Sequence, residues 1–261
     1  MPKYKNAPIE EAMCEFTFAT EGVAAQWDLT LPGRVQQHHA LKDVYNAPSR
    51  QQQVQQFVAD QTEPNATTNI SLSSALLRVL IPTTNNKAVL GIGSNTLSIS
   101  SLRDYEGWTA FRPRISTALG AYEEVAKPQE ITRINLKYIN RIIAPKPEAI
   151  TASEYLDDIS PYREAKIETT GELLKASLTA YHYRKEYTSQ NNVKIFVTQA
   201  TLQPADPKNS EFLLDIETVW DRQPITDFVE AMEKVELLHA MEGAIFESFI
   251  TDAARSLFNG T

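Results

Sequence analysis

Polar and hydrophobic residues alternate along residues 131–143, which read Ile-Thr-Arg-Ile-Asn-Leu-Lys-Tyr-Ile-Asn-Arg-Ile-Ile. A two-residue period is typical of a β-strand with one buried side and one solvent-facing side. The side predicted to be buried carries Ile134, Leu136, Tyr138 and Ile142. The opposite side carries Arg133, Asn135, Lys137 and Arg141. Three cations and an amide are more than solubility requires, so this polar side is a candidate binding surface.

The same alternation predicts strands before and after this segment. Residues 11–18 place Ala12, Cys14, Phe16 and Phe18 on one side and Glu11, Met13, Glu15 and Thr17 on the other. Further strands are predicted at residues 74–82, 88–92, 96–102, 174–181, 193–202 and 212–220. Residues 32–70 are instead polar and rich in Gln and Asn, and residues 51–60 within them are predicted to form a short helix.

A longer period predicts two helices. Apolar residues recur every three or four positions at Trp108, Phe111, Ile115, Leu119, Tyr122 and Val125. Pro128 is expected to end this helix. A second apolar stripe runs from the residue after Pro224 to the C-terminus, at Ile225, Phe228, Val229, Met232, Val235, Leu238, Ile245, Phe249, Ala253 and Leu257. Strands followed by a helix therefore occur twice along the chain.

This order predicts an α+β fold, in which helices pack on one face of an antiparallel sheet. We expect a curved sheet built from two strand-meander-plus-helix halves, residues 1–150 and 151–261, packed as one unit. One long C-terminal helix is expected to pack on the sheet. Trp108 and Trp220 each stand between the last strand and the helix of a half, which suggests a duplication of topology rather than of sequence.

Composition indicates a soluble globular protein and disfavours several functions. The 261 residues are 42% hydrophobic and 22% charged, with a net charge of −8. An acidic chain is not drawn to nucleic acid or to anionic membranes, although a local basic patch could still bind them. The single cysteine, Cys14, excludes a disulfide within the chain, so a cytoplasmic location is expected. The N-terminus has no signal-peptide pattern, and no apolar run is long enough to span a membrane.

Motifs that would indicate catalysis are weak or missing. Asp215-Ile216-Glu217-Thr218 matches the first motif of the DEDD exonucleases, but that motif normally opens its domain, and here only the end of the chain follows it. The histidines have no zinc-site spacing; they are His38, His39, His182 and His239. Cys14 lies on the predicted buried side of its strand, which favours an inert thiol. We therefore predict no catalytic residue, no metal site and no cofactor.

The cationic side of the 131–143 strand has two interpretations. Arg133, Lys137 and Arg141 recur every four residues, as do Glu11 and Glu15 on the polar side of the first strand. If the two strands are neighbours, these rows could form a ladder of opposite charges with a structural role. Alternatively, the cations form a polar floor under the helices that binds an anionic ligand or a partner's acidic segment. Asn135 and Asn140 would then help to orient the ligand.

Three stretches together resemble a known family. They are the start, Tyr4-Lys5-Asn6-Ala7-Pro8-Ile9-Glu10-Glu11-Ala12-Met13-Cys14-Glu15-Phe16; the middle, with Tyr105, Trp108, Phe111 and the strand from Arg133 to Arg141; and the end, with Leu213-Leu214-Asp215-Ile216, Leu238-His239 and residues 246–251. They are similar to a sporadically distributed bacterial family of proteins of about this length. The resemblance implies a bacterial origin, lateral gene transfer and an accessory role such as antiviral defence or mobile-element biology. It implies no particular activity.

Two functional hypotheses follow. The first is a non-enzymatic cytoplasmic binding protein that recognises a protein partner or a small anionic ligand, with residues 32–70 as a recognition segment. The second is an enzyme with a cationic pocket between sheet and helix for a phosphorylated or nucleotide substrate. Its candidate residues are Arg133, Lys137, Arg141, Glu11, Glu15 and His239. Nucleic-acid binding through the cationic strand is a third and weaker hypothesis, because the net charge opposes it and no aromatic side chains interleave with the cations.

Overall fold

The computed structural model describes residues 4–19, 28–60, 69–145 and 182–260, with the backbone alone for residues 52–60 and 69–77. These residues form one open antiparallel sheet of nine strands with the order β2-β3-β4-β5-β1-β6-β9-β8-β7, and four helices. The strands are β1 (Ile9–Phe18), β2 (Arg50–Asp60), β3 (Asn69–Pro82), β4 (Ala88–Gly93), β5 (Thr96–Ser101), β6 (Ile131–Pro145), β7 (His182–Thr188), β8 (Lys194–Leu202) and β9 (Asn209–Trp220). The helices are α1 (Leu31–Gln36), α2 (Trp108–Ala126), α3 (Phe228–Phe249) and α4 (Asp252–Asn259).

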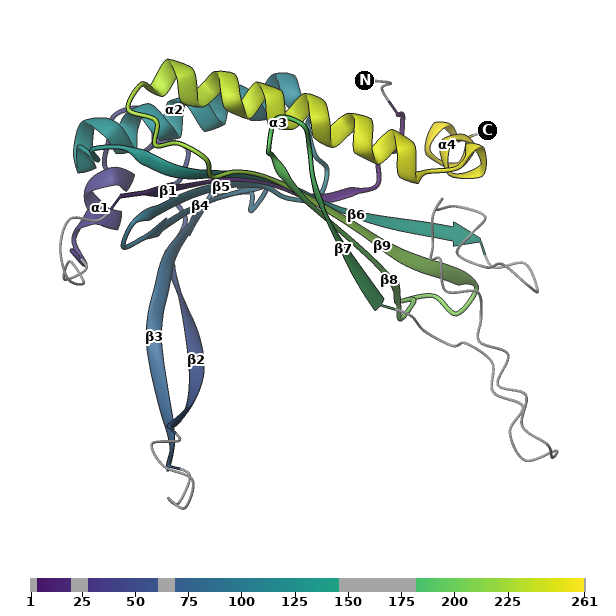
Figure 1. The fold of residues 1–261 in the computed structure, drawn as a ribbon, viewed down its shortest axis with the longest axis horizontal. Helices are drawn as coiled ribbons and strands as arrows, with labels where there is room; N and C mark the ends of the chain where they lie inside the picture. Colours follow the sequence, from purple (N-terminus) through teal and green to yellow (C-terminus); the bar gives the residue numbers. More distant parts are fainter. Residues whose placement is uncertain (1–3, 20–27, 61–68, 146–181, 261) are drawn as a thin grey trace.

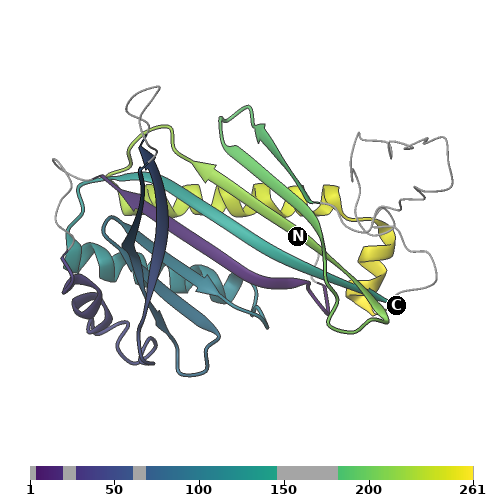
Figure 2. The same ribbon diagram turned by 90° about the horizontal axis from the view of Figure 1, so that it is seen from below.

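Helices α2 and α3 cover one face of the sheet, and the sheet curves away from them (Figure 1). The opposite face is therefore concave, and no described helix lies over it, while strands β2 and β3 project in front of part of it (Figure 2). Strands β2 and β3 extend beyond the rest of the sheet as a two-stranded arm, because β3 pairs with β4 only from Arg78 to Pro82. The predicted mixture of an antiparallel sheet with helices, an α+β fold, is confirmed.

The described strands follow the same order on both sides of the sheet centre. Strands β1 and β6 lie side by side in the middle. The meander β3-β4-β5 leads back to β1 and is followed by α2, and the meander β7-β8-β9 leads back to β6 and is followed by α3. The expected boundary between the halves, at residues 150 and 151, and the expected strand at residues 174–181 lie outside the described residues.

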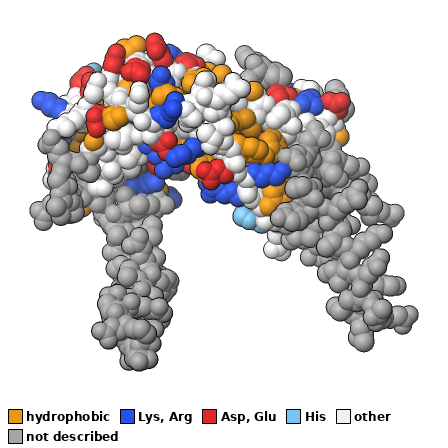
Figure 3. All heavy atoms as spheres, in the orientation of Figure 1, with side chains coloured by type: hydrophobic (Ala, Val, Ile, Leu, Met, Phe, Trp, Pro, Cys, Tyr) orange, Lys and Arg blue, Asp and Glu red, His pale blue; other side chains and the backbone are white. Residues whose placement is uncertain are grey.

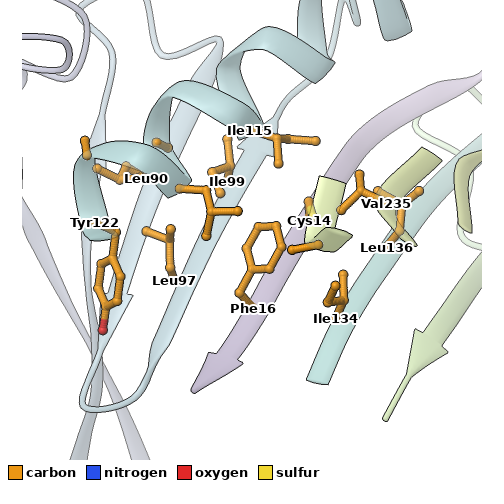
Figure 4. Close-up of a cluster of buried hydrophobic side chains, with 14 of the residues drawn as sticks. Cys14, Phe16, Leu90, Leu97, Ile99, Ile115, Tyr122, Ile134, Leu136 and Val235 are labelled. Atoms are coloured by element: carbon orange, nitrogen blue, oxygen red, sulfur yellow. The ribbon is translucent and has the colours of Figure 1, made fainter. Parts of the chain in front are cut away.

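The main hydrophobic core lies between the sheet and the helices. Phe16, Ile99, Leu136, Ile115 and Val235 are fully buried there, and Figure 4 shows them converging from β1, β5, β6, α2 and α3. Each buried side chain of this size contributes about 1.5–3 kcal/mol to folding. The two-residue alternation of the strands and the three-to-four-residue period of the helices therefore act together to define this layer.

The polar sequence of residues 51–60 predicts a short helix, and this prediction is wrong. These residues form strand β2. The backbone of β2 pairs with β3 along its whole length, from Arg50 opposite Leu80 to Asp60 opposite Asn69. Gln is intrinsically a good helix former, so the pairing with a neighbouring strand outweighs the local preference of this segment. The predicted recognition segment at residues 32–70 therefore contains helix α1 and an edge strand.

The apolar stripe at the C-terminus forms two helices rather than the single long helix expected. Helix α3 ends at Phe249, and Ile250 adopts an extended conformation with φ −105° and ψ 143°. The Thr251 hydroxyl then accepts a hydrogen bond from the Ala254 N–H at 3.3 Å and caps α4. Ile250 and Thr251 are both β-branched, and Thr251 is also a preferred N-cap residue, so the sequence favours a break between the two helices here. None of the helices within the described residues has the length and apolar character needed to cross a membrane.

Candidate functional site: the charged concave face

The candidate residues of β6 lie on the concave side of the sheet. Arg133, Lys137 and Arg141 point away from the helices, because the alternating Leu136 and Tyr138 are buried beneath them. Strand β1 lies on one side of β6, with Met13 opposite Lys137, and β9 lies on the other. We use the term concave face for the solvent-facing side chains of β1, β6 and β9 and their neighbours on β3 and β7.

Each of these three cations on β6 meets a carboxylate of β9. Lys137 Nζ lies 2.8 Å from Asp215 Oδ2, and Arg133 Nη2 lies 3.5 Å from Glu217 Oε1. The Arg141 Nε–H donates to Glu211 Oε2 at 2.7 Å, and Nη2 donates to the same oxygen. Glu211, Asp215 and Glu217 are spaced by even numbers of residues, so they lie on the same side of β9. This spacing is visible in the sequence and is the signal that predicts a row of carboxylates beside β6.

The predicted ladder between β1 and β6 is therefore wrong in its partners, although the two strands are neighbours. Glu11 stands opposite Ile139 and Glu15 stands opposite Asn135, so neither faces a cation across the pair. Glu15 instead accepts a hydrogen bond from Arg78 of β3 at 2.8 Å. The residue-by-residue alignment of two paired strands decides which charged side chains meet. Here the paired strands are distant in sequence, so the sequence near each charge does not specify its partner.

Arg78 reaches Glu15 across two intervening strands, and Gly91 of β4 makes this possible. Arg78 also donates to the Ser98 hydroxyl of β5 at 3.1 Å. A Cβ atom at Gly91 would lie 2.3 Å from Ser98 Oγ and 3.3 Å from Arg78 Cδ. The missing side chain at Gly91 thus provides the space in which the arginine lies flat on the sheet.

Glu217 is the centre of a small network. It accepts a hydrogen bond from Asn135 Nδ2 at 2.9 Å, and the guanidinium groups of Arg133 and Arg184 each lie 3.5 Å from it. The Arg184 guanidinium also lies 4.4 Å from the centre of the Phe196 ring. Two arginines share one carboxylate, so positive charge exceeds negative charge at this point.

The cations on the concave face lie nearer to solvent than their carboxylates. The Arg133 and Arg184 side chains are 45% and 54% exposed, whereas that of Glu217 is 17% exposed. Arg141 is 29% exposed above Glu211, which is 2% exposed. Figure 3 shows blue Lys and Arg side chains, with red carboxylates among them, along the hollow underside. In these ion pairs the arginine, rather than the carboxylate, is therefore the member that faces solvent.

Glu211 is held in its charged form although it is buried. Burial alone would raise the pKa of this carboxyl, but the Ala205 N–H and the Arg141 guanidinium outweigh burial and lower the pKa below its ordinary value. The Ala205 N–H donates to Glu211 Oε1 at 3.0 Å. A buried carboxylate with this many donors fixes the position of Arg141.

His239 is not part of the concave face. It lies on α3, on the other side of the sheet, where Trp108 stacks on its ring at 3.9 Å and its Nδ1 is 3.2 Å from the Tyr138 hydroxyl. Burial lowers the pKa of His239 to about 4, although Glu236 opposes the change. The pocket expected between sheet and helix, with His239 beside Arg133, Lys137 and Arg141, is therefore wrong in its geometry, because the sheet separates them.

A buried polar cluster that the sequence interpretation missed surrounds Tyr138. The Tyr105 hydroxyl lies 3.2 Å from the Tyr138 hydroxyl, which in turn contacts His239. Glu242 of α3 is 4% exposed, and its Oε1 has no hydrogen-bond partner among the described residues. Burial, and secondarily the charge of Asp215, raise the pKa of Glu242 well above its ordinary value. Its place in the core-facing stripe after Val235 and Leu238 is the signal that would have revealed it.

The remaining candidate chemistry is accounted for by packing. Asp215 and Glu217 lie beside Lys137 and Arg133, so the exonuclease-like motif is used for ion pairs. Within the described ranges, no three His, Cys, Asp or Glu side chains gather in a way that could hold a metal ion. Cys14 is fully buried, and burial raises the pKa of its thiol, which makes it unreactive.

Comparison with known proteins yields no match, either among protein-family models or among curated proteins. The resemblance to a sporadic bacterial family therefore stays a prediction, and the site is interpreted from its own geometry.

Proposed function

We propose that the protein is a non-enzymatic binding protein whose concave face receives an acidic segment of a protein partner. The observation that carries the proposal is the layering of charge, with exposed cations above more buried carboxylates, on a sheet face that no described helix covers. The cytoplasm of a bacterium, and an accessory system such as defence, are the setting that the composition and the sequence resemblance favour.

The buried carboxylates support this role because they hold the cations in place before a partner arrives. Glu217 positions Arg133 and Arg184, and Glu211 positions Arg141. Side chains that are already ordered lose little entropy on binding, and a guanidinium group retains further N–H donors for a second carboxylate. The arrangement thus suits carboxylates that approach from the solvent side.

An acidic protein segment fits this face better than nucleic acid does. The supporting carboxylates Glu15, Asp215 and Glu217 are still 17–18% exposed, and the whole chain carries a net charge of −8. A continuous row of phosphates would meet these acids as well as the cations, whereas the carboxylates of a peptide can be spaced to avoid them. Nucleic-acid binding is treated as an alternative outcome of the test.

The order of strands supports a further part of the proposal, that the two halves of the sheet arose by duplication. In this proposal the halves run from β1 to α2 and from β6 to α3, and each contributes a central strand, a three-stranded meander and a covering helix. The concave face then spans the junction of the halves, where β1 and β6 meet. Its two sides are not chemically equivalent, because the cationic residues are concentrated on β6 and on strands of the second half.

The test uses a fluorescently labelled Glu- and Asp-rich peptide, with duplex DNA of similar charge as the comparison, and measures fluorescence anisotropy. We expect salt-sensitive binding of the peptide that is lost in the Arg133→Glu, Arg184→Glu double variant. The matched control is Arg34→Glu, Arg112→Glu, which makes the same charge change on helices α1 and α2. Equal loss in both variants, or tighter binding of DNA than of peptide, would contradict the proposal.

A further inference from the structure

A cleft of about 580 Å³ opens at the end of the sheet beyond Arg141. Its walls come from residues 4–10, from the loop after β5, from the end of β6 and from α4, elements that are distant in sequence. We propose that this cleft binds a small phosphate monoester that carries an aromatic or aliphatic group. The cleft lies within the volume range of small-molecule sites, about 300–1,000 Å³.

The walls of the cleft are fixed by hydrogen bonds to neighbouring elements. The Asn6 N–H donates to the Phe258 carbonyl at 2.8 Å, and the Arg141 N–H donates to the Pro8 carbonyl at 2.8 Å. The Tyr4 hydroxyl donates to Glu247 Oε1 at 2.7 Å. The segment before β1 is therefore held between α4 and β6, and the cleft exists before any ligand enters.

Cationic donors in the cleft are only partly used by the protein. Arg103 is 69% exposed, and its Nε lies 3.8 Å from Glu10 Oε1, which is longer than a hydrogen bond. Arg141, whose Nε and Nη2 donate to a single oxygen of Glu211, also lines the cleft, and its Nη1 has no hydrogen bond to a described residue. Lys5 also lines the cleft and makes no ion pair with a described residue. The carboxylates of Glu10 and Asp104 also line the cleft, so its three cations outnumber its acids by one. Two guanidinium groups and an ammonium from separate elements suit an anion with several oxygens, such as a phosphate.

The same cleft offers apolar surface beside these donors. Ile143 lies at its edge and is 37% exposed, and Leu257 also lines it. The Tyr4 ring packs edge-on against Phe258, with 5.4 Å between the ring centres, so an aromatic wall is already in place. Figure 1 shows α4 above the C-terminal end of β6. An apolar group on the phosphate would contact this wall while the phosphate meets Arg103.

The two proposals share Arg141, but the cleft is tested separately, because the variant used is at Arg103, which lies outside the concave face. Phenyl phosphate is titrated into the protein by isothermal calorimetry, with phenol, phenylacetate and inorganic phosphate as comparisons. We expect saturable binding of phenyl phosphate, weaker binding of phenylacetate and inorganic phosphate, and none of phenol. Loss of one charge-assisted contact in Arg103→Ala should weaken binding roughly 10-fold or more.

Two controls make the result decisive. Arg34→Ala removes an arginine that is 52% exposed outside the cleft and should leave the affinity unchanged. Chemical-shift mapping with phenyl phosphate should show changes at residues 4–10 and 103–105. Absence of saturable binding, equal weakening by Arg34→Ala, or shifts that lie elsewhere would overturn the proposal. Because Arg103 is highly exposed, its replacement should not impair folding.

Discussion

Replacing Glu242 by Gln should change how the stability of the protein depends on pH. The carboxyl is buried under α3 with an unpartnered Oε1, and burial raises its pKa well above the ordinary value. In the unfolded chain the same carboxyl has a pKa of about 4.3. Between these two pKa values the folded state keeps the proton and the unfolded state releases it, so the free energy of unfolding falls as the pH rises.

The size of the effect follows from this difference in bound protons. A carboxyl with a raised folded-state pKa contributes stability that is fully present below the unfolded pKa and is lost as the pH rises towards the folded pKa. The loss is about 1.4 kcal/mol for each pH unit within that window. In Glu242→Gln no proton is exchanged at this position. The variant should therefore gain stability relative to the wild type as the pH rises above the unfolded-state pKa, by up to about 1.4 kcal/mol per pH unit.

Urea denaturation at several pH values between 4 and 8 measures this directly. The difference in unfolding free energy between Glu242→Gln and the wild type should grow with pH and then level off when the folded-state pKa is passed. Glu242→Met, which removes the polar group, should show the same pH trend. Parallel curves for wild type and both variants would refute the conclusion that this carboxyl is protonated in the fold.

Three other substitutions test the geometry by thermal or urea denaturation. Gly91→Ala should destabilise the protein by about 1–3 kcal/mol, because the added Cβ would lie 2.3 Å from Ser98 Oγ; an unchanged melting temperature would contradict the close packing. Arg141→Ala should cost about 3 kcal/mol because it leaves the buried Glu211 without its cation, and a loss below 1 kcal/mol would show that Glu211 is solvated. Thr251→Ala should cost about 1 kcal/mol through loss of the α4 cap, and no loss would mean that the cap does not form.

The strands and helices with strong local patterns could be predicted from the sequence. The alternation in β6 identified both its buried side, with Leu136 and Tyr138, and its polar side, with Arg133 and Lys137. Helix α2 follows its apolar period and ends at Ala126, and its C-cap Lys127 adopts a left-handed conformation just before Pro128, which was expected to end the helix. These features depend on residues that are close together in the chain.

Features that depend on distant pairing could not be predicted in the same way. Lys137 meets Asp215 only because β6 pairs with β9, and nothing near Lys137 specifies that partner. Arg78 meets Glu15 across two strands for the same reason. The Gln-rich sequence of β2 favours a helix locally, and the pairing of β2 with the distant residues of β3 outweighs that preference.

The central claim, that the concave face binds an acidic protein segment, is tested most directly by arginine labelling. The protein is treated with phenylglyoxal with and without the acidic peptide, and the modification of each arginine is measured by mass spectrometry. The account predicts that the peptide protects Arg133 and Arg184, and that Arg34 and Arg112 on the helices are modified to the same extent in both samples. Protection of the helix arginines, or unchanged labelling of Arg133 and Arg184 at saturating peptide, would contradict it.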